Sequence, residues 1–418
     1  MSDSGFTIKV ASSIEAVGRD NWDLCANPMR AWPQQDRRGA DRPATAEEEA
    51  AAPDPAAEHF NPFIAYDFLH ALEASGCVGQ RSGWTPLHLV AERPDGRLAG
   101  IMPAYGKTHS QGEYVFDWGW ADAYERAGGR YYPKLQVSVP FTPATGRRFL
   151  IRPGEDREEV SAALVAGAKA TLRSIGGSSV HTTFIGHDDW QWLGGQGFLQ
   201  RTDQQFHWHN QGYGGFDDFL ATLNSRHRKA IKRERREALA AGITIHPLTG
   251  SDITEDAWDA FFDFYMDTGS RKWGRPYLTR DFFSLVGESM ANDVLLVMAQ
   301  RNGRWIAGAI NFIGSDTLFG RNWGAVEHHP FLHFEVCYYQ AIEFAIERGL
   351  KTVEAGAQGE HKLARGYLPQ TTYSAHYIAD PALRRAVRDY LKHERSYVAQ
   401  AVRELAEAGP FRKTDDGS

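Results

Sequence analysis

Cysteine is scarce in this chain, and long apolar runs are missing from it. The 418 residues include three cysteines, Cys25, Cys77 and Cys337, which lie far apart and lack metal-ligand spacing. This usage excludes a disulfide-stapled scaffold and favours a reducing compartment. No apolar run approaches the roughly 18 residues that a membrane span needs. The first residues show no basic segment followed by an apolar one, so we expect a cytoplasmic protein.

Positive charge is not in excess either. The formal net charge is −7, so any contact with nucleic acid would need a local basic patch. The 42% hydrophobic and 24% charged residues are ordinary for a globular protein. The chain has no G-x-S-x-G elbow and no complete phosphate-binding loop. Its length suits two domains.

The chain contains an internal repeat. Three segments of the first half recur in the same order in the second half, which indicates one unit used twice. The matching pairs are 62–72 with 276–286, 89–105 with 297–313, and 197–208 with 366–377. The first copy is longer at two places. The Ala-, Glu-, Arg- and Pro-rich stretch at about 33–58 is predicted to be a disordered insertion, and 128–154 is predicted to be a second insertion.

Each copy predicts the same order of elements. A helical segment is followed by two strands that turn at Arg93–Gly96 or Arg301–Gly303. A third strand is expected at Glu113–Ala121 or Thr317–Val326, and then a helix and a strand. In the second copy this helix spans 333–349, where apolar residues recur at helical spacing before Gly349. The pattern predicts an α/β (α+β) fold with a mixed sheet flanked by helices in each copy.

A basic helix connects the two copies. Apolar residues at helical spacing predict a helix over 216–242, and Ser225–Glu237 holds seven Lys or Arg against two Glu. We therefore divide the chain into an N-terminal domain (1–213), a connecting helix (214–245) and a C-terminal domain that ends in a helix (246–418).

The sequence resembles a known family. The repeated unit looks like the core of the GNAT acyltransferase fold, and two units joined by a basic helix resemble the Fem-type transferases. The blocks that carry the resemblance are 112–135, 332–346 and 356–369, and they are similar to the FemAB-like predicted N-acyltransferases of peptidoglycan biosynthesis or recognition. The resemblance implies two tandem GNAT-like domains. One departure is Arg321–Val326, which matches the pyrophosphate-binding loop of acetyl-CoA enzymes only in part and is followed by Pro330.

The stretch after the last predicted strand of the second copy is the main candidate site. It combines glycines, which allow close approach of backbone to a ligand, with titratable side chains. By resemblance it lies at the mouth of the GNAT cleft, with Glu360 or His361 as the base. The residues expected to bind substrate or donor there are Gly356, Gln358, Gly359, Lys362 and Arg365. An ordinary capped and solvated turn is the competing interpretation.

Other candidates flank the same cleft or lie in the first copy. Glu335 is a second base candidate, although a carboxylate in a first helical turn also stabilises the helix dipole. Arg321 and Trp323 are candidates for holding the donor. In the first copy, an aromatic-rich segment suits recognition of a sugar, peptide or acyl ligand, with Asp117, Trp118, Tyr131 and Lys134 as the candidates, or else forms a core. We expect no metal, because Pro330 breaks the helix that would align His329 with His333.

These observations favour an N-acyltransferase whose second unit is catalytic and uses an acyl-CoA donor and an amine acceptor. The same-fold alternative is a Fem-type transferase that takes aminoacyl-tRNA and acts on a peptidoglycan precursor, with the basic helix at 226–236 contacting the tRNA. The residue pattern alone favours a solvated helix face with Glu234 and Glu237 as internal partners. An alternative of another class is a noncatalytic module that recognises cell-wall fragments.

Overall fold

The structure, a computed structural model, describes residues 5–31, 59–272, 276–357 and 359–412. The predicted disordered insertion at about 33–58 lies outside these residues. The contacts divide the chain into two compact units. Unit 1 comprises the chain up to Thr202 together with Thr372–Glu394, and unit 2 comprises Asp203–Thr371 together with the chain from Arg395. The sequence repeat and the folded units are therefore different divisions of the chain.

Unit 1 contains two groups of strands. The first is an antiparallel sheet in the order β1-β3-β4-β7, with bounds Thr7–Ala11, His88–Glu92, Leu98–Met102 and Leu150–Ile151. The second has the order β15-β8-β6-β5-β2, with bounds Leu368–Ile378, Ser179–Ile185, Lys134–Val137, Ala104–Lys107 and Trp84–Pro86. In this group β6 and β8 are parallel and the other pairs are antiparallel. The sheet of unit 1 is thus mixed, as the sequence predicted.

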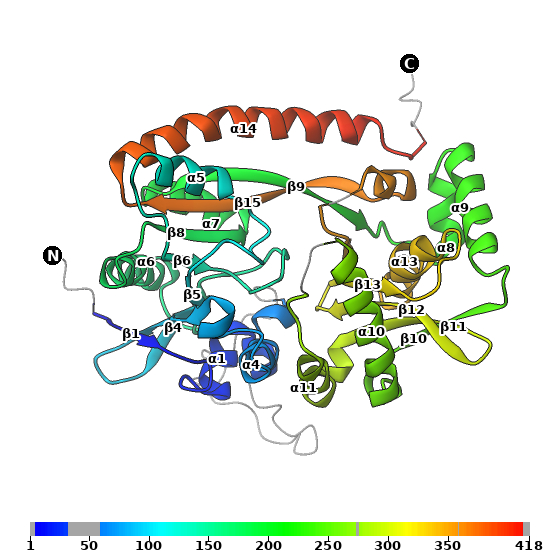
Figure 1. The fold of residues 1–418 in the computed structure, drawn as a ribbon, viewed down its shortest axis with the longest axis horizontal. Coiled ribbons are helices and arrows are strands. Elements are labelled where there is room, and N and C mark those ends of the chain that lie inside the picture. The colour runs from blue at the N-terminus through cyan, green and yellow to red at the C-terminus, as the bar shows by residue number, and fades with distance from the viewer. Residues whose placement is uncertain (1–4, 32–58, 273–275, 358, 413–418) are drawn as a thin grey trace, which may run out of the picture. The chain divides into compact units, whose positions relative to one another are not determined.

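Helices cover the sheets of unit 1 (Figure 1). The longest helix wholly inside the unit is α6 (Arg157–Ser174), which begins at Asp156, whose side chain accepts a hydrogen bond from the Glu159 amide. Its buried face packs on strand residues such as Leu135 and Val180. The other α-helices in the described part of unit 1 are α1 (Arg19–Ala26), α2 (Pro28–Ala31), α4 (Tyr66–Ala74), α5 (Trp118–Arg126), α7 (His187–Gly195) and the first part of α14 (Pro381–Glu407).

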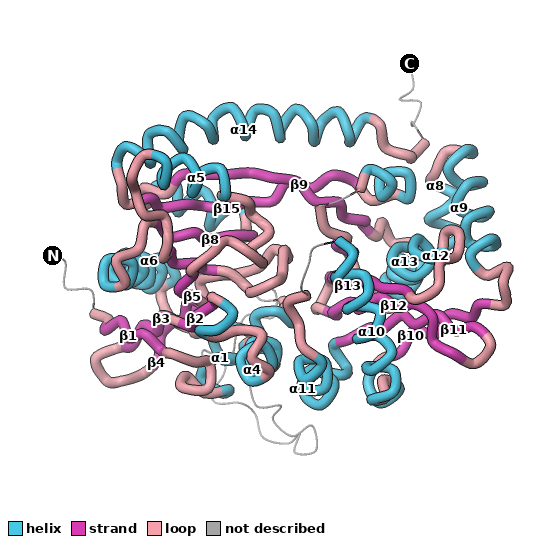
Figure 2. Tube along the Cα trace, viewed as in Figure 1, coloured by secondary structure: helices cyan, strands magenta, loops and turns pink. Residues whose placement is uncertain are grey.

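Unit 2 has one mixed sheet in the order β10-β11-β12-β13-β14-β9, whose strands are magenta in Figure 2. The bounds are Ile243–Leu248, Val294–Arg301, Arg304–Ile313, Thr317–Ala325, Thr352–Glu354 and Leu199–His209. The predicted turn at Arg301–Gly303 is a two-residue hairpin in which Asn302 and Gly303 have φ of 51° and 74°. Positive φ at both positions is the geometry of a type I′ turn. The strands β13 and β14 are parallel.

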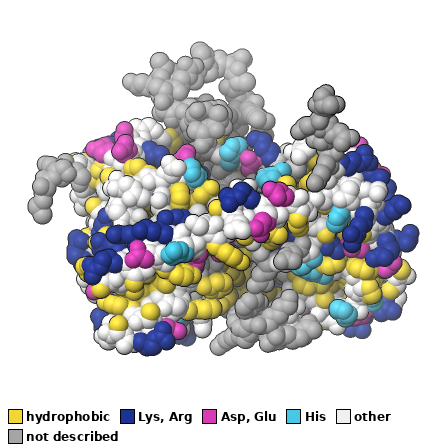
Figure 3. Space-filling model, turned by 90° about the horizontal axis from the view of Figure 1, so that it is seen from above, with side chains coloured by type: hydrophobic (Ala, Val, Ile, Leu, Met, Phe, Trp, Pro, Cys, Tyr) yellow, Lys and Arg dark blue, Asp and Glu magenta, His cyan; other side chains and the backbone are white. Residues whose placement is uncertain are grey.

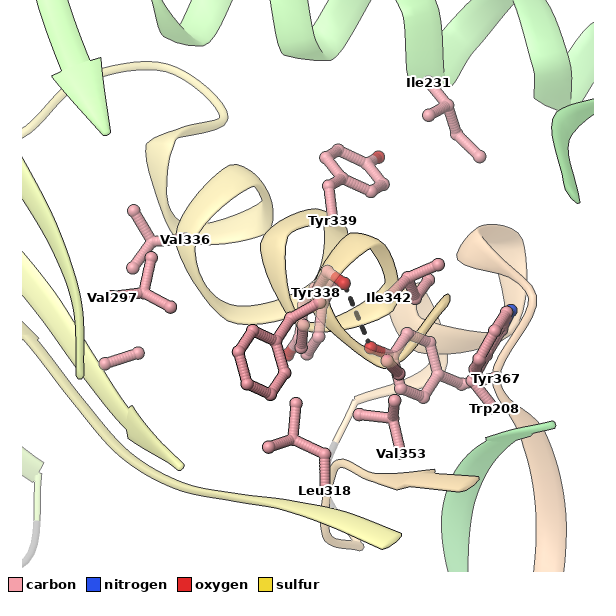
Figure 4. Close-up of a cluster of buried hydrophobic side chains, with 14 of the residues drawn as sticks. Trp208, Ile231, Val297, Leu318, Val336, Tyr338, Tyr339, Ile342, Val353 and Tyr367 are labelled. Atoms are coloured by element: carbon pink, nitrogen blue, oxygen red, sulfur yellow. Dashed lines mark hydrogen bonds between the residues drawn. The ribbon is translucent and has the colours of Figure 1, made fainter. Parts of the chain in front are cut away.

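The helices of unit 2 include the predicted helix at 333–349, which is confirmed. It runs through α12 (Leu332–Phe334), a π-helical turn (Glu335–Tyr339) and α13 (Gln340–Glu347). Figure 4 shows its buried face, where Tyr338 and Ile342 lie beside Leu318 and Val353, and the Tyr367 hydroxyl donates to the Tyr338 carbonyl at 3.2 Å. The other described helices of unit 2 are α8 (Phe216–Thr222), α9 (Ser225–Ala238), α10 (Glu255–Lys272), α11 (Arg280–Met290), the end of α14 and the 3-10 helices Gly250–Asp252, Ala291–Asp293 and Glu360–Arg365.

The third strand of the first copy was predicted at the wrong place. Residues 113–121 form a loop followed by the start of α5, and β6 occupies the position between β5 and β8. The segment 128–154, predicted to be an insertion, contains both β6 and β7. The physical reason is that Asp117 turns its carboxylate into the unit, where Lys134 and Tyr131 bond it. The segment between β5 and β6 therefore folds over the sheet instead of joining it.

Candidate functional site

The two parallel strands of unit 2 separate along their length. The pairing of β13 with β14 covers three residues and ends at Phe319 and Glu354. Beyond this point β13 continues, while β14 ends. The ladder between β12 and β13 contains an extra residue between Gly320 and Trp323, so a β-bulge falls where the strands part. Such a parting leaves the edge of β13 without its parallel neighbour.

Glu354 and His207 lie on one face of this sheet. They are cross-strand partners on β14 and β9, and Phe319 on β13 continues the same row. The preceding residue on β14, Val353, pairs with Trp208, and both belong to the core that includes α13. Because successive side chains of a strand point to opposite faces, Glu354 and His207 project away from that core.

The carboxyl group of Glu354 is buried beside a neutral imidazole. Its Oε1 lies 3.9 Å from Nε2 of His207, and 11% of its side chain is exposed. Burial raises the pKa of Glu354 to about 8, an effect that the Arg321 guanidinium of β13 partly opposes. Burial also lowers the pKa of His207 to about 3, with smaller effects from His209 and Lys362. Near neutral pH, this carboxyl group is poised to gain or lose a proton while the imidazole stays neutral.

The chain after β14 forms the loop that the sequence singled out. Gly356 and Gly359 have φ of 74° and 101°, and a Cβ on Gly359 would lie 2.2 Å from Cε1 of His361. Glycine is therefore required where this imidazole packs on the backbone. Lys362 is buried and donates hydrogen bonds to the carbonyls of Ala355 and Gly356, which ties the 3-10 helix to the end of β14. Burial lowers the pKa of Lys362 to about 8.

His361 lies among aromatic side chains. Its Nε2 is 3.0 Å from the Tyr338 hydroxyl, and its ring centroid is 5.4 Å from that of Phe334. Trp323 comes close to the same group, because its ring is 5.1 Å from His333, which in turn lies 6.0 Å from His361. Gln358 and the side chain of Glu360 lie outside the described residues.

Two predicted site residues are engaged by other side chains instead. Glu335 is completely buried, and its oxygens accept bonds from Arg235 at 2.8 and 3.0 Å and from Gln340 at 2.8 Å. Arg365 donates to Glu234 at 2.8 Å, and its guanidinium lies 3.4 Å from the centroid of the Phe334 ring. Both residues thus help attach α9 to the rest of unit 2.

The candidates of the first copy come together in unit 1. Lys134 is fully buried and donates to Glu113 at 2.7 Å and to Asp117 at 2.5 Å, while the Tyr131 hydroxyl donates to Asp117 at 2.7 Å. Burial alone would raise the pKa of Asp117, but the Lys134 ammonium lowers it. Trp118 is different, because half of it is exposed. The cluster is a buried ion network in which Lys134 forms ion pairs with Glu113 and Asp117.

The helix α9 has a buried face and a charged face. Ile231, Glu234 and Ala238 are buried, and Arg235 binds Glu335 and Glu343. The exposed cations are Arg226, Lys229, Lys232, Arg233 and Arg236. In Figure 3, dark blue side chains gather at the right edge, where Figure 1 places α9. The solvated cations therefore form one surface of this helix.

Sequence reasoning did not select Glu354 and His207. The available signals were an acidic residue inside the apolar strand 351–357 and the match of His207 with His376 in the repeat. In the structure His376 pairs with His181 across β15 and β8, as His207 pairs with Glu354. Titratable side chains thus occupy the same position of the sheet in both units.

Antiparallel strands, a helical crossover and a parallel strand that parts from its neighbour make each unit GNAT-like, so this is an α/β protein with two such units in tandem. The chain belongs to the FemAB-like family, described as peptidoglycan biosynthesis/recognition, which it matches over residues 44–413. The search of curated proteins found no match.

Several solved structures are similar to the chain. FemX has 13% sequence identity and a TM-score of 0.48, with 74% of this chain and 92% of that one covered. A tandem GNAT protein from the clavulanic acid biosynthesis pathway has 11% identity and a TM-score of 0.44, with 90% and 99% covered. L-PGS from Bacillus licheniformis has 11% identity and a TM-score of 0.46, with 81% and 99% covered.

The described part of the chain contains no helix long and apolar enough to cross a membrane. Within the same residues, no three His, Cys, Asp or Glu side chains are grouped so that they could hold a metal ion.

Proposed function

We propose that this protein transfers an acyl group from an activated donor to an amine, and that unit 2 performs the reaction. The observation that carries the proposal is the parting of β13 from β14 beside a buried carboxyl group. A donor with amide groups can bond to the edge of a strand as an added strand does. Backbone N–H groups at the bulge would stabilise the oxyanion that forms when the amine attacks the carbonyl.

The matching position in unit 1 supports this choice of unit. There β6 and β8 are also parallel and also pair over three residues. Beyond the paired residues, the segment 138–149 lies against the edge of β8. The Gly146 amide donates to the Phe184 carbonyl at 3.0 Å, and Nε of Arg148 donates to the Thr183 carbonyl at 3.1 Å. A donor entering unit 1 would have to displace this segment.

The proposed contacts follow from the two strands and the loop. The donor would lie against β13 and the loop after β14, with Arg321, Trp323, Gly356, Gln358, Gly359 and Lys362 as the binding residues. Glu360 and His361 are the base candidates that the family resemblance suggests. Glu335 is a weaker choice for the base, because it is already paired with Arg235. Arg365 is a weaker choice for contacting the donor, because it is already paired with Glu234.

The proposed donor is an acyl-CoA thioester, and the compartment is then the cytoplasm, where such thioesters are made. Aminoacyl-tRNA is the second candidate, favoured by the exposed cations of α9, because Lys and Arg side chains neutralise phosphates. The family description leaves a noncatalytic role in recognising cell-wall fragments as the alternative, which binding of a muropeptide without turnover of any donor would support.

A thermal-shift titration with CoA, acetyl-CoA and longer acyl-CoAs tests the donor. A ligand that binds only the folded state stabilises it by about 2.7 kcal/mol at a hundred times its dissociation constant. We expect a shift that grows with the length of the acyl chain. No shift with any CoA species would contradict the thioester proposal and leave aminoacyl-tRNA as the donor to test.

The tRNA alternative has its own test. Reversing the charge of Arg226, Lys229 and Lys232 together should abolish binding of aminoacyl-tRNA while leaving the melting temperature unchanged, since all three side chains are exposed. Unchanged binding would discard the alternative.

A further inference from the structure

Glu354 differs from two other buried carboxylates of unit 2, Glu234 and Glu335. Glu234 is bonded by Arg365 at 2.8 Å, and Glu335 is bonded by Arg235 at 2.8 Å. Buried charges in proteins are normally paired in this way. Among the described residues, the nearest charged or titratable partner of the Glu354 carboxyl group is the imidazole of His207 at 3.9 Å. A structural role as half of an ion pair therefore does not explain this carboxyl group.

Its position on the sheet is where the strands part. Glu354 is the last residue of β14, and its partner Phe319 is the last residue of β13 that pairs with β14. Its side chain projects from the face of the sheet opposite the α13 core. The positive charge of Arg321 on β13 lowers the pKa of this carboxyl group. A group at the end of the shorter strand faces any ligand that lies along the longer one.

We propose that Glu354 is the proton acceptor of the transfer reaction, with His207 as its neutral neighbour; this deepens the proposed function and rests on it. The amine nitrogen attacks the carbonyl carbon of the donor, and the new N–C bond forms as the C–S bond of a thioester breaks. One proton of the nitrogen passes to the Glu354 carboxylate, and the departing thiolate takes a proton from solvent. An ester donor would follow the same steps with C–O cleavage.

The surroundings tune this carboxyl group for the role. A general base works best when its pKa lies near the working pH. Burial raises the pKa of Glu354 to about 8 and keeps His207 uncharged, so the imidazole does not hold the carboxylate in an ion pair. The charged groups that face the pair are Arg321 from β13 and Lys362 from the 3-10 helix, with His209 next to His207 on β9.

The test compares two variants with matched controls. The control for Glu354→Gln is Glu347→Gln, because Glu347 is an exposed glutamate at the end of α13. The control for His207→Gln is His209→Gln, which alters the neighbouring and more exposed imidazole on β9. Release of free thiol from an acyl-CoA in the presence of an amine is followed from pH 6 to pH 9. We expect the wild-type rate to rise with pH through a midpoint near pH 8, where half of the Glu354 carboxyl groups have lost their proton. Glu354→Gln should be at least ~100-fold slower, the usual contribution of general-base catalysis, and should lose the part of the pH dependence that the acceptor's own ionisation does not explain.

Two further measurements separate a catalytic role from a structural one. Donor binding by thermal shift should be unchanged in Glu354→Gln. The carboxyl group should titrate with a pKa of about 8, seen as a ¹³C signal that the variant lacks. A Glu354→Gln rate within twofold of wild type, or a carboxyl group that titrates below pH 5, would overturn the assignment and leave the proposed function intact. No turnover of any donor by the wild-type protein would overturn both.

Discussion

Replacing Arg235 with methionine should strongly destabilise unit 2. Arg235 is the cation that holds the completely buried Glu335, with N–O distances of 2.8 and 3.0 Å, and it also bonds Glu343. Removing one partner of a buried ion pair costs about 3–5 kcal/mol, because the other charge remains buried without compensation. The neighbouring Arg236 is exposed, so Arg236→Met should change stability by no more than about 0.5 kcal/mol.

Thermal unfolding followed by circular dichroism measures the effect. For a unit of this size, 1 kcal/mol corresponds to roughly 2–4 °C, so even the lower figure predicts a fall in Tm of about 6–12 °C. The double variant Arg235→Met with Glu335→Met should recover most of the loss, since apolar side chains of similar size can replace a buried pair. Equal Tm values for Arg235→Met and Arg236→Met would refute the reasoning, as would a double variant less stable than Arg235→Met alone.

Three other changes have defined outcomes. Gly324→Ala should lower the free energy of unfolding by about 2–4 kcal/mol, and Tm with it. The reason is that the added Cβ would lie 2.1 Å from the Phe264 carbonyl oxygen of α10. Glu354→Gln should stabilise the protein at pH 8 and not at pH 4.5, as urea unfolding at both values would show. The folded pKa of about 8 exceeds the usual 4.5, so the folded state binds the extra proton and loses stability as pH rises between these values. Lys134→Met should cost about 3–5 kcal/mol in the same assay, because it leaves the Asp117 carboxylate buried without its cation.

Local patterns predicted a large part of the fold. The turn at Arg301–Gly303 was predictable because asparagine and glycine tolerate the positive φ that a two-residue hairpin needs. The helix at 333–349 was predictable from apolar residues at helical spacing. Both features depend on residues within a few positions of one another, and the repeat strengthened each prediction by giving it twice.

The errors and omissions involve contacts between distant parts of the chain. The segment 113–121 carries aromatic residues that favour a strand. However, Asp117 accepts a hydrogen bond from Lys134, which lies beyond the helix α5 in the sequence. Glu354 became a candidate only when β9 placed His207 beside it, a pairing of residues from different copies of the repeat. Sequence spacing cannot report such pairings, and the predicted roles of Glu360, His361 and the residues around them stay predictions.

The composition of unit 1 has a consequence for synthesis of the protein. Strand β15 completes the sheet of this unit, and its residues are encoded after nearly all of unit 2. At about 5–20 residues per second, the ribosome needs roughly 10–30 s to pass from Thr202 to Thr372. During that interval β8 lacks its partner, and its edge is open to mispairing. A chain truncated before β15 would therefore lack a strand of unit 1, which links the folding of the first half to completion of the second.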